Sequence, residues 1–148
     1  MKETKVHFLR TALLFLFLAV SGAAAYSAAE KTEKVVYHIT DSANATALLT
    51  NVRNHLNANP KAQIVVVAHG GGVDFLLEDA KNKNGNPYDA VVQELAGRHD
   101  VKFKVCDNTL KSRSIDKGRV LAEASIVPSG VAEVARLQIQ EGYAYLKP

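Results

Sequence analysis

Short apolar runs along residues 30–148 are separated by stretches in which apolar residues recur at helical spacing. The run IVVVAHG at 64–70 is the clearest strand, because a continuous β-branched run is typical of a central parallel strand covered on both faces. Four further short runs also predict strands. The five expected strands lie at 35–40, 64–70, 101–106, 125–127 and 143–147.

The segments between these strands predict helices, each with one apolar stripe. Capping and breaking residues mark their ends, with Asn, Ser or Pro before a stripe and Gly or Asn-Pro after it. The expected helices run from Ser42 or Asn44 to Asn59-Pro60, follow Gly70-Gly71-Gly72, run from Asn86-Pro87 to Gly97, form one or two turns within 107–124, and run from Pro128-Ser129 to Gly142.

Five strands separated by helices, with no internal repeat and no long linker, predict one α/β domain. We expect an open, mostly parallel sheet with helices on both faces, of the flavodoxin-like kind. In such sheets ligands bind beyond the carboxyl ends of the strands. Polar residues at the strand ends are therefore the candidates for chemistry.

Residues 1–29 have the pattern of a secretory signal peptide. Three basic residues among the first ten precede the apolar run TALLFLFLAV at 11–20, and small side chains suited to cleavage follow it. The apolar run spans about half the roughly twenty residues that a membrane-spanning helix needs. The segment is therefore expected to direct export and to be removed, rather than to anchor the chain.

Cleavage is expected after Ala25 or Ala29, and the sequence does not choose between them. The mature domain at 30–148 would be periplasmic or secreted, with no membrane contact. It has 15 Lys and Arg against 14 Asp and Glu, so most of the excess positive charge belongs to the signal. Basic residues are scattered and Trp is absent, which argues against a nucleic-acid surface.

Cys106 is the single cysteine and the last residue of its expected strand. Asp107, Asn108 or Thr109 would cap the next helix, whose N-terminal partial charge favours a thiolate. Lys104 would lie on the same side of the strand as Cys106. The alternative is a buried and inert cysteine, the commonest kind of free cysteine.

Further cations lie near this thiol in the sequence. Lys102 shares the expected side of the strand with Lys104, and Lys111 and Arg113 follow within the next turn. We expect these cations to lower the pKa of Cys106 and the charge of Asp107 to oppose them.

His69 ends the central strand and would face the same strand-end crevice as Cys106, as a base or a hydrogen-bond donor, while His38 lies near the end of the first strand. The glycines that begin at Gly70 could cradle an anion with their N–H groups, although tight packing explains them as well. Neither a nucleotide-binding GxGxxG pattern nor a histidine or cysteine pattern for a metal is present, so no cofactor and no metal is expected.

Three segments resemble the DsrE/DsrF-like proteins of sulfur metabolism. They are VVVAHGGGVDFLL at 65–77, VKFKVCDNTLKSRSID at 101–116 and SIVPSGVAEVARLQIQEGYAYLKP at 125–148. The resemblance implies a flavodoxin-like domain that assembles as a trimer or hexamer. In the active DsrE and TusD members, a cysteine at the corresponding strand end accepts sulfane sulfur as a persulfide and passes it to a partner.

The resemblance thus implies that Cys106 is the sulfur acceptor of an exported carrier, or sulfurtransferase-like protein, served by donor and acceptor proteins. Two alternatives stay open: a non-catalytic module that binds a small ligand or anion, and an assembly partner with an inert thiol. The candidate substrate-binding residues around Cys106 are His69, Gly70, Gly71, Lys104, Asn108, Thr109 and Arg113.

Overall fold

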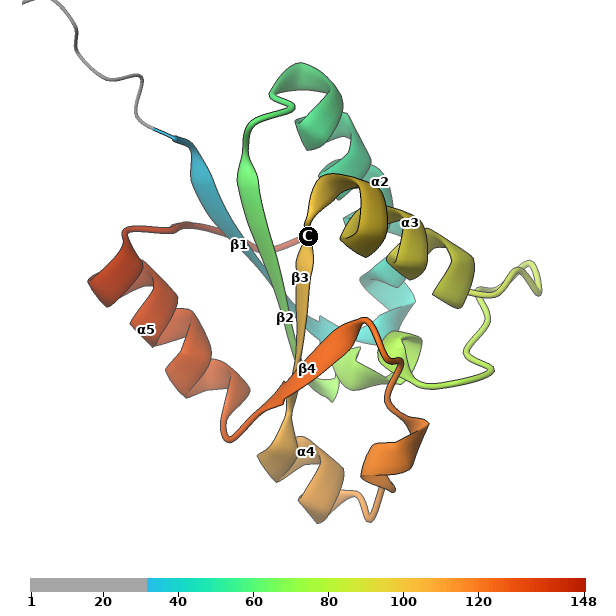
Figure 1. Ribbon diagram of the computed structural model, residues 1–148. Coiled ribbons are helices and arrows are strands. Elements are labelled where there is room, and N and C mark those ends of the chain that lie inside the picture. Colours follow the sequence, from blue (N-terminus) through green and yellow to red (C-terminus); the bar gives the residue numbers. More distant parts are fainter. Residues whose placement is uncertain (1–31) are drawn as a thin grey trace, which may run out of the picture. The chain divides into compact units, whose positions relative to one another are not determined.

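Five parallel strands in the order β4-β3-β2-β1-β5 form the sheet of the computed structural model, which describes residues 32–148 (Figure 1). Each expected strand is present within one residue of its expected bounds, and the sheet is wholly parallel. The expected signal peptide at 1–29 lies outside the described residues. The strands are β1 Lys34–Asp41, β2 Gln63–Gly71, β3 Lys102–Cys106, β4 Ala124–Val127 and β5 Ala144–Leu146.

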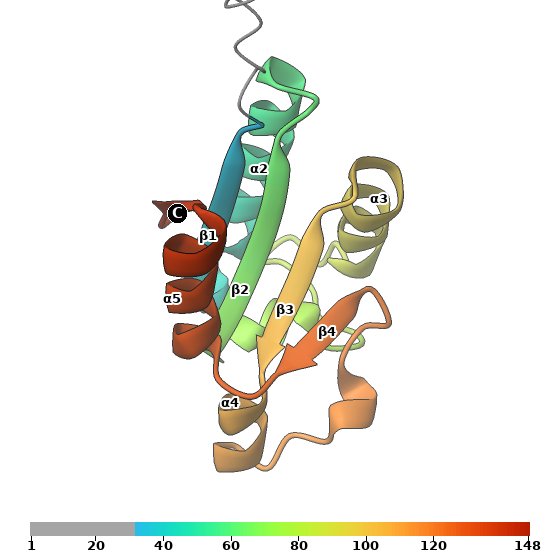
Figure 2. The same ribbon diagram turned by 60° about the vertical axis from the view of Figure 1, so that its left-hand side comes forward.

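Helices cover both faces of the sheet, as expected. Helices α2 and α3 lie on one face and α5 lies on the other, while α4 continues from the end of β3 (Figures 1 and 2). Three short 3-10 turns complete the domain. The bounds are α2 Ala45–Ala58, α3 Asp89–His99, α4 Asp107–Ser112, α5 Gly130–Glu141, η1 Ser42–Asn44, η2 Gly72–Leu76 and η3 Lys117–Arg119.

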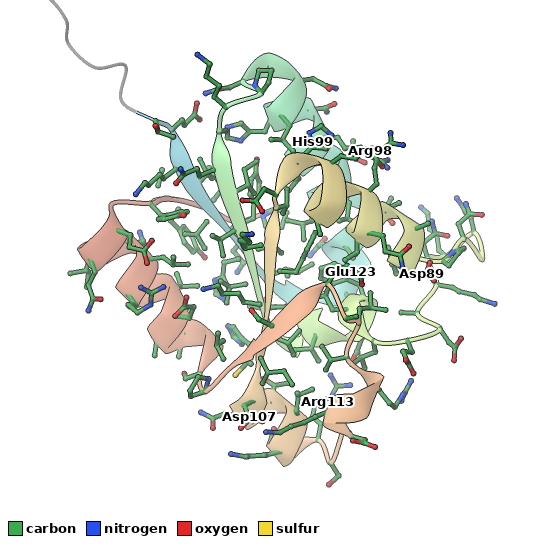
Figure 3. All side chains as sticks on the ribbon, in the orientation of Figure 1. Asp89, Arg98, His99, Asp107, Arg113 and Glu123 are labelled. Carbon is green, nitrogen blue, oxygen red and sulfur yellow. The ribbon has the colours of Figure 1, made fainter. Side chains whose placement is uncertain are left out.

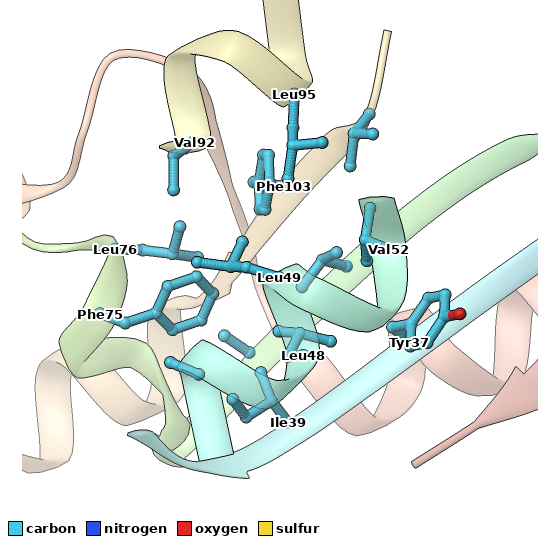
Figure 4. Close-up of a cluster of buried hydrophobic side chains, with 14 of the residues drawn as sticks. Tyr37, Ile39, Leu48, Leu49, Val52, Phe75, Leu76, Val92, Leu95 and Phe103 are labelled. Atoms are coloured by element: carbon cyan, nitrogen blue, oxygen red, sulfur yellow. The ribbon is translucent and has the colours of Figure 1, made fainter. Parts of the chain in front are cut away.

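The face under α2 and α3 holds the larger apolar core (Figure 4). Helix α2 contributes an apolar stripe at three- and four-residue spacing, and β3 contributes Phe103 and Val105, which are 1% and 0% exposed. The turn η2, where the sequence predicted a short α-helix, adds the buried Phe75 and Leu76. Burial of this kind stabilises a domain by roughly 25 cal/mol per Å² of apolar surface, so this face supplies most of the driving force for folding.

The start and end of α3 differ from the prediction. Pro87 forms an isolated antiparallel bridge with Lys81, and the Tyr88 N–H donates to the Ala80 carbonyl at 3.0 Å. This pairing keeps the chain extended at Pro87, so the helix begins at Asp89 instead of Asn86-Pro87. At the other end the helix runs through Gly97 to His99, because Asp100 takes the left-handed capping position at φ 56°.

The last helix begins and ends where the sequence indicated. The Ser129 hydroxyl accepts a hydrogen bond from the Ala132 N–H at 3.4 Å, and Gly142 closes α5 in the left-handed conformation. Val134 and Leu137 of α5 pack on Val36, Val65 and Val67 of the sheet. This second core is small and leaves the carboxyl ends of the strands to polar side chains. No helix within 32–148 is long and apolar enough to cross a membrane.

Candidate functional site

The carboxyl ends of β1, β2 and β3 place His38, His69 and Cys106 on the face of the sheet that α5 covers. Val67 of β2 pairs with His38 on one side and with Lys104 on the other. Paired residues of a parallel sheet share a face, and side chains two residues further along share it too. His69 and Cys106 therefore lie beside each other at the strand ends, as the sequence predicted.

Gly130, the first residue of α5, sits directly against these two side chains. A Cβ atom built on Gly130 would lie 3.1 Å from the Cβ of His69 and 3.2 Å from that of Cys106. These distances are tighter than ordinary van der Waals contacts. The absence of a side chain thus lets the N-terminus of α5 approach the sheet between the histidine and the cysteine.

Cys106 is buried, with 5% of its surface exposed. Burial raises the pKa of its thiol, but the N–H group of Gly130, the hydroxyl and N–H of Thr109, and the N–H of Asn108 lower it, and the net pKa lies below that of an ordinary cysteine. Cys106 is the N-cap residue of α4, and its side chain forms no capping hydrogen bond. The surrounding N–H groups act most strongly when the sulfur is charged, so the site favours a thiolate.

The expected cap of α4 was wrong by at least one residue. Cys106 itself holds the N-cap position, and Asp107 is the first helical residue. Asp107 forms ion pairs with Lys111 at 2.8 Å and with Lys117 at 2.7 Å, at the end of the domain where Figure 3 also shows Arg113. Lys104 is similarly paired with Glu133 of α5.

These ion pairs correct the expected source of the thiolate's stability. The sequence suggested that nearby cations, Lys104, Lys111 and Arg113, would lower the pKa of Cys106. The groups that lower it are instead amide N–H groups and one hydroxyl, which carry no net charge. Each of the cations is held by a carboxylate, which reduces its effect on the sulfur.

Both backbone polar groups of Gly70 are hydrogen-bonded to side chains of α4 and its C-cap residue, Arg113. Its N–H donates to the Thr109 hydroxyl at 2.9 Å, and its carbonyl accepts from the Arg113 guanidinium at 3.1 Å. Arg113 also binds the Asp74 carboxylate through two nitrogens, at 2.7 and 3.2 Å. Gly70 has φ 58°, in the left-handed region where glycine is favoured. Its N–H is therefore committed to Thr109.

The glycine run also packs closely against β1. A Cβ on Gly72 would lie 2.3 Å from the Ile39 carbonyl oxygen, which only glycine permits. This contact supports tight packing as the reason for Gly72.

The two histidines of the site contact each other. The ring centroids of His38 and His69 are 4.7 Å apart, and the Nδ1 atom of His38 shares a hydrogen bond with the Tyr145 hydroxyl at 2.9 Å. Burial lowers the pKa of both histidines, and the neighbouring Lys147 lowers both further, so both imidazoles are neutral near pH 7. The Nε2 atoms of both rings are buried and have no hydrogen-bond partner within the described residues.

A separate groove of about 1040 Å³ opens beside η1, α2 and η2. Asp41, Asp74, Tyr88 and Arg119 are among the residues that line it, and Cys106 and the two histidines are not. Its volume is suited to a small ligand, but it lies apart from the cysteine of the candidate site. Within 32–148, no group of three or more His, Cys, Asp or Glu side chains could hold a metal ion.

The structure thus gathers His69, Gly70, Asn108, Thr109 and Cys106 at one end of the sheet. Gly71 is the last residue of β2, next to Gly70. Lys104 and Arg113 form ion pairs with Glu133 and Asp74. Whether any of these residues binds a substrate stays a prediction. Sequence reasoning missed Gly130 and Asp74. The one available signal for Gly130 was its place directly after Ser129, the N-cap residue of α5. No local sequence pattern pointed to Asp74.

The sequence and the structure were compared with known proteins. The model of the DsrE/DsrF-like family matches residues 16–148. A solved structure from Methanobacterium thermoautotrophicum, titled a protein of unknown function, MTH1491, is 35% identical, with a TM-score of 0.69 over 78% of this chain and 99% of that one. The ychN protein of E. coli shares the fold at 13% identity, with a TM-score of 0.62 over 79% and 99% of the two chains. A search of curated proteins found no match.

Proposed function

The chain belongs to the DsrE/DsrF-like family, whose members generally act in sulfur relay, and from this membership and the surroundings of Cys106 we propose that the protein carries sulfane sulfur as a persulfide on Cys106. The observation that carries the proposal is the set of N–H groups and the hydroxyl that lower the pKa of this thiol despite its burial. A carrier needs a thiolate that can attack a sulfur donor and later act as a leaving group.

The transfer step exchanges one S–S bond for another. The Cys106 thiolate attacks the outer sulfur of a donor persulfide, R–S–SH, and the donor's S–S bond breaks. The donor leaves as R–S⁻ with the bonding electron pair, and Cys106 becomes Cys–S–SH. Atoms, charge and electrons balance without an external oxidant, because the sulfane sulfur only moves from one thiol to another.

The neutral groups around Cys106 suit both steps of the transfer. The N–H groups of Gly130, Thr109 and Asn108 stabilise the thiolate, which attacks the donor and is also the leaving group when the sulfur is passed on. Cys106 is only 5% exposed, so the donor must be narrow. In a persulfide the outer sulfur lies about 2 Å beyond the first, which brings the transferable atom nearer to a partner.

Intact-protein mass spectrometry after anaerobic incubation with polysulfide tests the proposal. The mature wild-type protein should gain about 32 Da per sulfur atom, and Cys106→Ser should gain nothing while keeping its circular dichroism spectrum. If the native wild type stays unmodified and reacts only after denaturation, the thiol is inert. The proposal then gives way to an anion-binding or assembly role for the same N–H groups.

We also propose that the carrier works after export, in the periplasm or outside the cell, on the evidence of the signal-like segment at 1–29. Expressed with this segment in a Gram-negative host, the protein should be recovered from the periplasm with an N-terminus at Tyr26 or Glu30. Mass mapping of the N-terminus measures this. Recovery from the cytoplasm with Met1 retained would contradict it.

Assembly into a homo-oligomer is part of the same proposal. Four exposed apolar side chains on α5 and β5 support it, because a free surface of this kind costs solubility unless a partner covers it. They are Val131, Ile139, Tyr145 and Leu146. Light scattering of the mature protein should give the mass of a trimer or hexamer, and a clean monomer at micromolar concentration would contradict this part of the proposal.

A further inference from the structure

Thr109 is buried, with 8% of its surface exposed, and within 32–148 no other polar or charged side chain is buried to this extent. It is the third residue of α4, and Cys106 is the N-cap of the same helix. The N-cap and third positions of a helix lie next to each other, as the reciprocal bonds of a capping box show. Helix geometry therefore places the Thr109 side chain beside the sulfur.

The hydroxyl of Thr109 already has a donor. The Gly70 N–H donates to its oxygen at 2.9 Å. A hydroxyl has one hydrogen of its own, and accepting a bond on one side of the oxygen directs that hydrogen toward the other side. The Thr109 side chain is one of the groups that lower the pKa of Cys106, as a donor to the sulfur does. The bond from Gly70 leaves the Thr109 hydrogen free to point toward Cys106.

The backbone of Gly70, whose N–H donates to Thr109, is itself held in place. The guanidinium of Arg113, the C-cap residue of α4, binds the Gly70 carbonyl and the Asp74 carboxylate, so the peptide after Gly70 is held as well. The left-handed backbone at Gly70 turns its N–H toward α4. The orientation of the Thr109 hydrogen is thus fixed by the fold, and it costs little to keep when the sulfur becomes charged.

We propose that Thr109 is a positioning residue, which donates a hydrogen bond to the Cys106 thiolate and is held in its donating orientation by the Gly70 N–H. The inference rests on the proposed function in one respect: both take the thiolate as the reacting form of Cys106. It assigns Thr109 to the sulfur of the protein, whereas the sequence suggested a contact with the substrate.

The rate of alkylation of Cys106 by iodoacetamide, measured against pH, tests this role. Thr109→Val keeps the branched shape and removes the hydroxyl, and its apparent Cys106 pKa should rise by about one unit. That shift means about a tenfold lower alkylation rate at pH values below both pKa values. Thr109→Ser restores the hydroxyl and should return the pKa to within about 0.3 units of the wild type.

One further variant, Thr109→Ala, keeps the test valid if Thr109→Val misfolds. Thr109→Ala and Thr109→Ser differ by the hydroxyl alone, so the pKa of the alanine variant should exceed that of the serine variant even if Thr109→Val does not fold. Equal Cys106 pKa values in the hydroxyl and non-hydroxyl variants would overturn the inference. A wild-type pKa no lower than that of a free thiol would instead contradict the thiolate on which the proposed function depends.

Discussion

The side chains on the two faces of strand β3 lie in different surroundings. Phe103 and Val105 point under α2 and α3 into the large apolar core, and both are almost completely buried. Lys104 and Cys106 point to the other face, where α5 supplies an ion-pair partner for the lysine and an N–H group for the sulfur. Alternate residues of one short strand thus face the apolar core on one side and the candidate site on the other.

The difference shows why the reactive end can be polar. Desolvation offsets part of the stabilisation that the partly buried Lys104–Glu133 pair and the two imidazoles provide. The apolar core beneath α2 and α3 compensates for this cost, so substitutions on one face should leave the other face unchanged.

The largest loss of stability is expected from a substitution in the apolar core under α2 and α3. Leu48 of α2 is 0% exposed, and Leu48→Ala should lower the free energy of unfolding by about 2–5 kcal/mol through lost burial and the cavity left behind. Leu48→Met, which conserves volume, should cost less than about 1.5 kcal/mol. Urea denaturation measures both. The apparent pKa of Cys106 in folded Leu48→Ala should match the wild type, and a clear shift would show that the faces are coupled.

Acid should weaken the face that α5 covers. Arg136 first, and then Lys104, lower the pKa of Glu133 to about 2, whereas in the unfolded chain it is near 4.5. The unfolded state binds the proton first as pH falls, so this stabilisation is complete above about pH 4.5 and is lost as pH falls toward 2. It amounts to on the order of 2 kcal/mol after allowance for partial solvent screening.

The free energy of unfolding, measured between pH 6 and 2 for Glu133→Gln and for a control variant at another ion-paired carboxylate, tests this dependence. Glu133→Gln should lose the part of the acid dependence that Glu133 causes. Glu94→Gln removes a more exposed pair with Arg53 and should change stability by less than about 1 kcal/mol. Equal acid dependence in the two variants would contradict the role of Glu133.

A methyl group at Gly130 should disturb the reactive end. Its Cβ would lie 3.1 Å from that of His69 and 3.2 Å from that of Cys106, so α5 must shift and draw its N–H away from the sulfur. Gly130→Ala should raise the apparent pKa of Cys106 by about half a unit, which alkylation rates measure. In Gly97→Ala the new methyl group meets no atom within 4 Å, so it should stabilise α3 by up to about 1 kcal/mol and leave the thiol unchanged.

The smallest effect on the pKa of the thiol is expected from Lys111, in the helix that follows Cys106. Lys111 is tied to Asp107, so Lys111→Gln removes a cation that a carboxylate already balances. The apparent pKa of Cys106 should change by less than about 0.3 units. A rise in pKa comparable to that in Gly130→Ala would show that the cations do stabilise the thiolate, as predicted from the sequence.

The sequence predicted the parts of the fold that depend on local patterns. The β-branched run of β2 and the Ser129 and Gly142 ends of α5 were readable because each signal lies within the element itself. The start of α3 was not, since a bridge between Lys81 and Pro87 decides it. The pairing of Lys104 with Glu133 joins residues 29 positions apart, so the sequence suggested a free cation where the structure has an ion pair.

The central claim is that sulfur moves on to Cys106 and off again, and one measurement follows both steps. Native protein is loaded with polysulfide, freed of excess reagent and mixed with glutathione, while its intact mass is recorded over time. The mass should rise by about 32 Da per sulfur and return to its starting value as glutathione takes the sulfur, with neither step in Cys106→Ser. A protein that gains no sulfur until it is unfolded, or that keeps its sulfur in the presence of the thiol, would contradict a carrier.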